Sequence, residues 1–152
     1  MAASSFATLG ELADAVGRHL GYSDWWEISQ ERVNTFADAT DDHQWIHIDV
    51  ERAATGPFGG PIAHGYLTLS MAVPFVEQIL DVGGVAMGIN YGTNKVRFPA
   101  PVPVGSRLRA GATLASLDTF DGGAQATLDL VFEVEGGSKP VCVAQVVYRY
   151  YR

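Results

Sequence analysis

An aspartate and a histidine stand five positions apart where a predicted helix runs out into a loop. Asp42 and His47 lie within residues 36–47. A carboxylate can accept or return a proton, and histidine is the side chain whose unperturbed pKa lies near neutrality. The pair therefore predicts general acid–base chemistry. The alternative is a solvated helix end with no catalytic role.

The bulk composition narrows the classes of protein that this chain can belong to. Its 152 residues predict one domain spanning residues 1–152, with 47% hydrophobic and 18% charged residues. The net charge of −7 argues against binding to nucleic acid or to an anionic membrane. The chain shows neither a secretory signal nor a membrane-spanning apolar run, so we expect a cytoplasmic protein. The single cysteine, Cys142, is expected to be a small buried hydrophobe.

The first half of the chain is predicted to be mainly helical. Thr8 and Glu11 fit a capping box, and Gly21 can end the helix that follows. Ser29 is a suitable N-cap for a second helix. The Gly- and Pro-rich residues 49–63 are expected to be irregular. The elements predicted before that segment are a helix at 9–20, a short strand at 25–28 and a helix at 30–39, followed by the loop that carries Asp42 and His47.

The second half begins with an apolar helix and continues as strands. Residues 65–80 are apolar nearly all round, which predicts a buried helix, and Pro74 should kink it. Apolar and polar residues alternate in residues 124–135, as in a strand with one buried face. Glycines at 122–123 and 136–137 suit hairpin turns. The four strands predicted here lie at residues 85–98, 108–114, 124–134 and 141–151.

These elements predict an α+β fold. Five strands, counting the short one, form an antiparallel sheet, and wrapping that sheet around the one long apolar helix buries both. This describes the hot-dog fold. The two free edges of such a sheet predict edge-to-edge pairing, and therefore a homodimer.

The segment around Asp42 resembles the signature of the MaoC-like (R)-specific enoyl-CoA hydratases, which is Gly-Asp-x-Asn-Pro-Leu-His. Asp42 matches the motif aspartate and His47 the motif histidine, with Ile46 at the leucine. The positions that depart from the motif are Asp41 for glycine, Gln44 for asparagine and Trp45 for proline. An aspartate in place of glycine predicts a different backbone geometry in this turn. From Trp25 onward the chain resembles actinobacterial single-domain members of the family.

The resemblance implies reversible syn addition of water to a trans-2-enoyl-CoA, which yields the (R)-3-hydroxyacyl-CoA. Asp42 and His47 would hold and activate the water. The amide of Gly65, in an Ala-His-Gly triplet before the buried helix, would bind the thioester carbonyl, and His64 would order the helix start beside the substrate. The acyl thioester is then the substrate and no cofactor is expected. An acyl-carrier protein is an alternative carrier to CoA.

Residues 90–105 resemble the family's strand that ends in a Lys/Arg-Phe-x-x-Pro-Val-x-x-Gly run. Lys95 and Arg97 are candidates for contacts with CoA phosphates, because cations at a strand end can bind an anionic nucleotide. The alternative is that these alternating charges mark a solvent-facing surface. Asn90 and Tyr91 are candidates for lining the acyl pocket.

Three other functions are alternatives to this one. His43 and His47 have the spacing of a helical metal site, but Gln44 stands where the usual zinc motif has glutamate, so no metal is expected. A hot-dog thioesterase is one alternative; such enzymes typically use a carboxylate near the helix. A non-catalytic acyl-CoA-binding subunit, disabled by the departures at Asp41 and Trp45, is the other.

Overall fold

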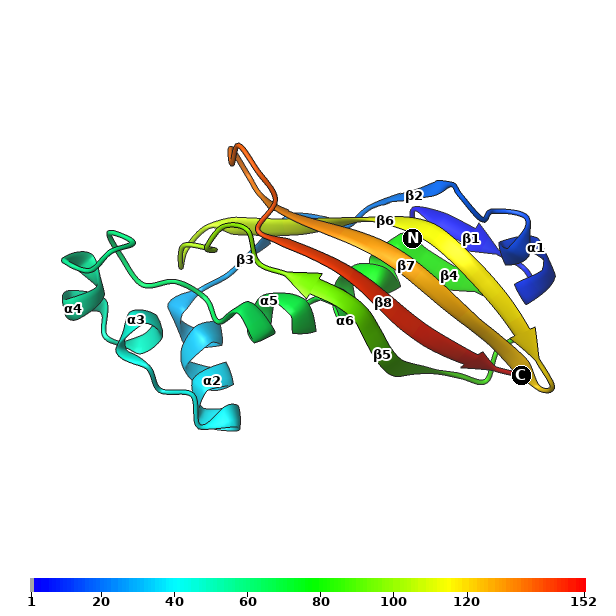
Figure 1. Cartoon of the computed structure of the whole chain (residues 1–152), viewed down its shortest axis with the longest axis horizontal. Helices are drawn as coiled ribbons and strands as arrows, with labels where there is room; N and C mark the ends of the chain where they lie inside the picture. Colours follow the sequence, from blue (N-terminus) through cyan, green and yellow to red (C-terminus); the bar gives the residue numbers. More distant parts are fainter. Residues whose placement is uncertain (1) are drawn as a thin grey trace.

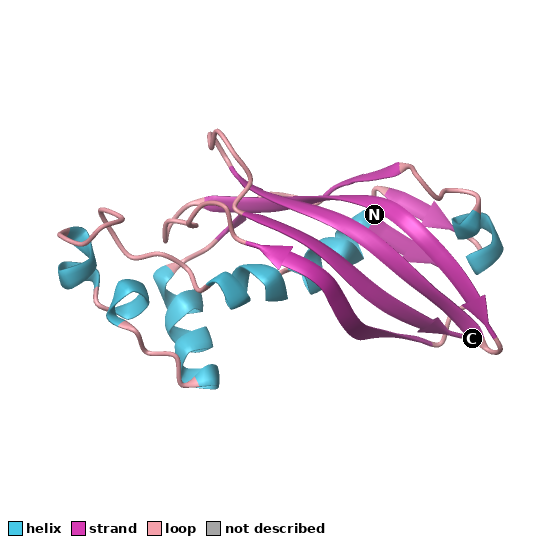
Figure 2. Cartoon of the chain, viewed as in Figure 1, coloured by secondary structure: helices cyan, strands magenta, loops and turns pink. Residues whose placement is uncertain are grey.

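The computed structural model describes residues 2–152. Its main feature is a long, curved antiparallel sheet that wraps around two consecutive helices (Figures 1 and 2). The strand order is β2-β6-β7-β8-β5, and β3 pairs with β6 beside β2. The strands of this sheet are β2 His19–Tyr22, β3 Trp26–Glu27, β5 Met87–Arg97, β6 Arg107–Phe120, β7 Gly123–Val134 and β8 Cys142–Tyr151.

The helices form a central pair, α5 and α6, a group beyond one end of the sheet, and the short α1 toward the other end (Figure 1). The central pair lies on the concave face, whereas α2, α3 and α4 extend beyond the end of the sheet (Figure 1). A small parallel pair, β1 Ser4–Phe6 with β4 Leu80–Val82, was not predicted from the sequence. The helices are α1 Leu9–Ala13, α2 Gln30–Thr40, α3 Trp45–Ile48, α4 Val50–Ala54, α5 Gly65–Ser70 and α6 Ala72–Ile79. None of the helices in residues 2–152 is long and apolar enough to cross a membrane.

The first helix is shorter than the sequence pattern predicts. Thr8 caps it as expected, accepting a hydrogen bond from the Glu11 amide at 3.1 Å. The helix nevertheless ends at Ala13, and the chain turns at Gly17, whose φ of 88° an α-helix cannot contain. The predicted last turn of the helix, including the buried Leu20, is instead the strand β2, paired with β6. Pairing in the sheet has overridden the local helical pattern.

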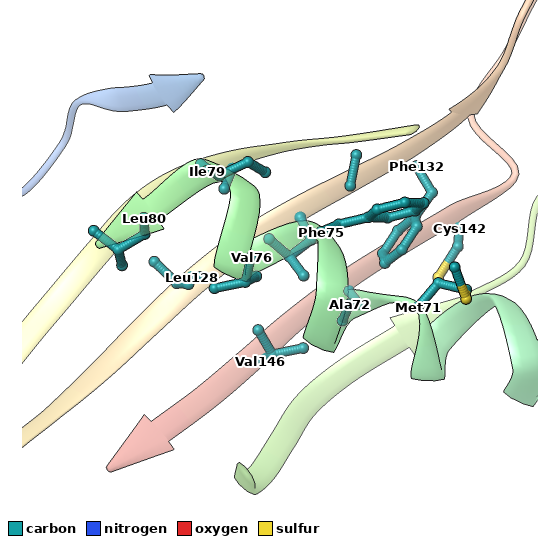
Figure 3. Packing of buried hydrophobic residues seen from close by; sticks show 14 of the residues in the cluster. Met71, Ala72, Phe75, Val76, Ile79, Leu80, Leu128, Phe132, Cys142 and Val146 are labelled. Atoms are coloured by element: carbon teal, nitrogen blue, oxygen red, sulfur yellow. The ribbon is translucent and has the colours of Figure 1, made fainter. Parts of the chain in front are cut away.

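The long apolar helix is divided into α5 and α6 at Met71. Pro74 explains the break, because it has no N–H for the carbonyl of Ser70 and its ring crowds that carbonyl. Both halves remain against the sheet. Figure 3 shows α6 packing its apolar side chains onto the strands, and the rings of Phe75 and Phe132 lie 6.1 Å apart between centroids. The predicted burial of this helix is therefore confirmed.

Cys142 lies in this core beside Met71, fully buried as predicted (Figure 3). Burial raises the pKa of its thiol to about 12, because the thiolate would have no water around it. A thiol with that pKa is not a nucleophile near neutral pH. Cys142 is thus a packing residue.

Two further segments differ from the sequence-based expectations. His47 lies on the one-turn helix α3 and not in a loop. The segment expected to be irregular contains α4, capped by the side chain of Asp49, which accepts from the Arg52 amide at 3.0 Å. The short helices hold the connection between α2 and α5 in a defined path. That path decides where His47 lies.

Candidate active site

Helix α2 and the turn after it present Asp42. Ser29 caps α2 by accepting a hydrogen bond from the Arg32 amide at 3.1 Å, as predicted. The helix ends at Asp41, which is left-handed with φ 61° and ψ 19°. Aspartate is one of the few non-glycine residues that adopt this conformation readily. Asp41 thus takes a backbone conformation that glycine also favours, contrary to the expectation of a different geometry.

His47 is held from two sides. Its Nδ1 lies 2.6 Å from the carbonyl oxygen of Ile62, and its own backbone carbonyl accepts a hydrogen bond from Gln30 Nε2 at 2.8 Å. A carbonyl can only accept, so Nδ1 carries the ring proton and Nε2 carries the lone pair. The side chain of His47 is buried, with 6% of the residue exposed. The free Nε2 is therefore a fixed proton acceptor.

The protonation state of His47 follows from this burial. Desolvation is the largest effect and lowers the pKa of the imidazole below its ordinary value of 6.5, and the nearby His64 lowers it further. The hydrogen bond to Ile62 and the charge of Asp42 oppose this shift. With the pKa lowered, His47 is neutral near pH 7. It can therefore accept a proton there.

Asp42 completes a pair with His47. A carboxylate oxygen of Asp42 and ring nitrogens of His47 and His64 lie within 4.8 Å of one another. A water that donates hydrogen bonds of about 2.8 Å to two acceptors separates them by about 4.5 Å. The separation of Asp42 and His47, which is at most 4.8 Å, is compatible with one shared water. The two residues singled out from the sequence are brought together in space.

His64 lies at the centre of the site. Its Nε2 lies 3.0 Å from the backbone carbonyl of Asp42, and its ring stacks on His47 with centroids 3.9 Å apart and planes at 26°. Phe36 of α2 covers it from another side, at 4.9 Å between ring centroids. The residue is 2% exposed. It touches both members of the pair and immediately precedes Gly65.

Gly65 is the first residue of α5. Within residues 2–152 no group accepts a hydrogen bond from its amide, as expected for the first turn of a helix. It lines an apolar surface cavity of about 330 Å³ together with Phe58, Ile62 and Phe98. A free N–H at the edge of an apolar cavity can donate to the carbonyl oxygen of a bound thioester.

The side chains of Asp42, His47 and His64 each offer one atom that can ligate a metal ion. Zinc binds histidine in the plane of the ring at about 2.0–2.1 Å. The rings of His47 and His64 are stacked at only 26°, so their planes do not meet at that distance from both nitrogens. The geometry suits a water better than a metal ion. His43 is not in the group, since its Nε2 bonds Asp38 at 2.9 Å on the exposed end of α2.

The remaining sequence candidates lie elsewhere. Asn90 lines a groove between α6 and β5 with Val73 and Tyr148. Tyr91 stacks on Arg149, whose guanidinium carbon is 3.8 Å from the ring centroid. The structure does not bring these residues to the Asp42 group. Lys95 and Arg97, the candidates for phosphate contacts, also lie away from this group. On β5 they stand opposite two outward-facing residues of β8, Gln145 and Val143 respectively.

Gln30 is a site residue that the sequence did not indicate. In residues 2–152, two buried side-chain polar atoms lack a hydrogen-bond partner, Gln30 Oε1 and His64 Nδ1. Such an atom costs about 1–3 kcal/mol of stability. Both belong to residues that hold the backbone of the acid–base pair. No sequence signal marks Gln30, because its role depends on α3 folding back against α2.

Comparison with known proteins agrees with this geometry. The model of the MaoC like domain matches residues 11–131. The 3-hydroxyacyl-thioester dehydratase Z of Mycobacterium tuberculosis (strain ATCC 25618 / H37Rv) is 55% identical over 147 residues, covering 96% of this chain and 97% of that protein. The monoamine oxidase regulatory protein of Archaeoglobus has a TM-score of 0.82 at 25% identity, covering 100% of this chain and 99% of that one. An (R)-hydratase from A. caviae involved in PHA biosynthesis has a TM-score of 0.68 at 25% identity, covering 88% and 94%.

The fold is thus the hot-dog fold of hydratases and dehydratases, as predicted, with β2 as an additional strand. This chain belongs to the MaoC-like dehydratase family, which confirms the resemblance seen in its sequence. It is an enzyme of the hydratase and dehydratase class.

Proposed function

We propose that this protein is an (R)-specific enoyl-thioester hydratase that interconverts a trans-2-enoyl-CoA and the (R)-3-hydroxyacyl-CoA. The observations that carry the proposal are that the buried His47 keeps its Nε2 free to accept a proton, and that a ring nitrogen of His47 lies within 4.8 Å of an Asp42 carboxylate oxygen. The free amide of Gly65 follows His64, the residue stacked on His47. The residues proposed as base, carboxylate and oxyanion donor thus all contact or adjoin His64.

The proposed hydration uses one water. Its oxygen attacks the β-carbon while one of its protons passes to His47 Nε2, and Asp42 accepts a hydrogen bond from the other. The π electrons of the double bond move toward the thioester oxygen, where the Gly65 amide stabilises the developing enolate. The imidazolium of His47 then returns its proton to the α-carbon. Hydroxyl and proton come from one water on one face, which gives syn addition, and dehydration is the reverse.

Each participant is suited to its step by its surroundings. Burial keeps His47 neutral, and hence able to accept the proton. The bond from Nδ1 to Ile62 fixes the ring so that Nε2 is the nitrogen that reacts. Positioned general acid–base groups typically contribute about 10²–10⁴-fold to a rate. The apolar cavity beside Gly65 offers a place for the acyl or pantetheine portion of the thioester.

The structure also bears on the alternatives. A hot-dog thioesterase is expected to use a carboxylate near the central helix, and α5 carries no acidic residue in its first turn. A non-catalytic binder does not require a buried histidine held in a single tautomer. Neither alternative explains the hydrogen bonds that fix His47. CoA and acyl-carrier protein remain alternative carriers, and no cofactor takes part in the proposed reaction.

We further propose that the enzyme is a homodimer. Strand β5 is a free edge of the sheet, and every residue in it except Val96 is exposed. The edge carries apolar side chains, including Ile89 and Met87. A long exposed edge strand of this kind favours pairing with a second copy of the chain. Sedimentation of the purified protein as a monomer at micromolar concentration would contradict this.

The reaction can be tested through the absorbance of the enoyl-thioester band. Crotonyl-CoA and a medium-chain enoyl-CoA serve as substrates, and an (R)-specific dehydrogenase reports the configuration of the product. Asp42→Asn should remove most activity, whereas Asp41→Asn is a matched control that keeps a residue suited to the left-handed conformation. Release of free CoA without hydration would support the thioesterase instead. Binding of the acyl-CoA without turnover would support the non-catalytic subunit.

A further inference from the structure

His64 makes contacts that go beyond ordering the start of α5. Its Nε2–H donates to the backbone carbonyl of Asp42 at 3.0 Å, and its ring supports His47 at 3.9 Å between centroids. We propose that His64 is a positioning residue that sets Asp42 and His47 at the separation one water requires. This inference rests on the proposed hydratase function and assigns to His64 a role distinct from binding the substrate.

Asp42 needs such an anchor. Its side chain is exposed, and the contact from the Gln44 amide to its Oδ1 is long, at 3.5 Å. The direction of the carboxylate is therefore set mainly by the backbone of the turn after α2. His64 provides a hydrogen bond from outside that turn to the Asp42 backbone. Loss of this bond would leave the carboxylate attached to a turn with little else to fix it.

His47 is placed by the other surface of the same ring. The bond to Ile62 fixes one nitrogen of His47, and the stacked His64 ring limits how the imidazole can tilt. Phe36 packs against His64 and connects the stack to α2. The buried ring of His64 thus contacts helix α2, the turn that carries Asp42, and helix α3.

The Nδ1 of His64, which has no hydrogen-bond partner within residues 2–152, indicates why histidine occupies this position. A carbonyl accepts from Nε2, so Nε2 bears the proton, and Nδ1 carries a lone pair that has no hydrogen-bond partner in the described part of the chain. A phenylalanine would fill the same space without a buried unsatisfied nitrogen. The cost of that nitrogen is explained if the position requires a flat ring together with an N–H donor at Nε2, which histidine supplies.

Two substitutions separate these requirements. His64→Phe keeps a ring against His47 but removes the donor, and we expect kcat to fall about 10- to 100-fold with KM within about threefold, as for a misplaced catalytic group. In His64→Gln the amide Nε2 lies as many bonds from Cβ as the histidine Nε2. This variant should keep more of the wild-type kcat than His64→Phe. Thermal melting of both variants establishes that they are folded.

A double-mutant cycle tests whether His64 acts through Asp42. In the Asp42→Asn background, His64→Phe should change kcat by less than about threefold, because the carboxylate it positions is already absent. A full multiplicative loss in that background would overturn the proposal, as would a His64→Phe enzyme with wild-type kcat. ¹⁵N spectra of the imidazoles add a readout without substrate: the proton of His64 is expected on Nε2, and a proton on Nδ1 would overturn the proposal.

These outcomes are distinct from failure of the proposed function. Absence of hydration by the wild-type enzyme, with CoA and carrier-protein substrates alike, would refute the hydratase function itself. Hydration at the same rate by wild type and His64→Phe would refute only the positioning role.

Discussion

Replacing His47 with asparagine should separate its catalytic nitrogen from its structural one. The asparagine Nδ2 occupies a position comparable to the histidine Nδ1, which lies 2.6 Å from the Ile62 carbonyl oxygen in the wild-type protein. The asparagine can therefore still donate a hydrogen bond to that carbonyl. The proton acceptor Nε2 is lost. Removal of a general acid–base group costs about 10²–10⁴-fold in kcat. At about 1.4 kcal/mol per tenfold, this corresponds to about 3–6 kcal/mol of transition-state stabilisation.

The same substitution has a smaller effect on folding. It removes a stacked, buried ring and leaves the amide Oδ1 without an assigned donor, at a cost of about 1–3 kcal/mol. Domains of this size are typically stable by about 5–15 kcal/mol, so most molecules stay folded at 25 °C. Each kilocalorie lowers the Tm by about 2–4 °C. The loss of activity should therefore greatly exceed any loss of folded protein.

The assay follows the enoyl-thioester absorbance of crotonyl-CoA, with a thermal melt on the same samples. His43→Asn is the matched control, because this neighbouring histidine is exposed and forms an ion pair with Asp38. It should retain activity within about twofold of wild type. A folded His47→Asn enzyme that keeps more than a tenth of the wild-type kcat would refute the assignment of His47 as the base.

Three further predictions concern pH, substrate binding and stability. The kcat/KM for hydration should decline toward acid pH with a midpoint below pH 6.5, because His47 must be neutral and burial lowers its pKa. The control variant Asp38→Asn should show the same midpoint in its pH profile. Gly65→Ala places a Cβ 3.2 Å from the Phe98 ring. It should lower kcat/KM about tenfold by crowding the amide while the Tm changes little, because the exposed Phe98 ring can shift to relieve the contact. Loss of the α2 cap in Ser29→Ala should cost about 1 kcal/mol in denaturant unfolding with little change in kcat.

The lowered pKa of His47 also gives stability a pH dependence of known sign. Its folded pKa lies below the unfolded value of 6.5, so the unfolded chain binds the proton more readily as the pH falls. The neutral, buried state of His47 is therefore fully favourable above that unfolded value. Its contribution to stability declines as the pH decreases toward the folded pKa. Acid thus weakens both the base and the structure that holds it.

The sequence by itself determined the proposed acid–base pair, the alternating strands and the buried apolar helix. Each of these depends on the identity and spacing of residues near one another in the chain, as Asp42 and His47 do. The hairpin after β6 followed from its turn glycines, and its strands meet where Phe120 pairs with Gly123. The break in the helix followed from Pro74. Local chemistry was sufficient in these cases.

Tertiary structure decided the rest, because those features depend on segments far apart in the chain. Leu20 belongs to a strand and not a helix because β6 is there to pair with it. Gln30 reaches the His47 carbonyl only because α3 folds back onto α2. The approach of His64 to Asp42, across 22 positions of sequence, is likewise a product of the fold. Sequence spacing placed Asp42 and His47 near one another, and long-range contacts fixed the tautomer and burial of His47 and the separation of the two residues, on which the proposed chemistry depends.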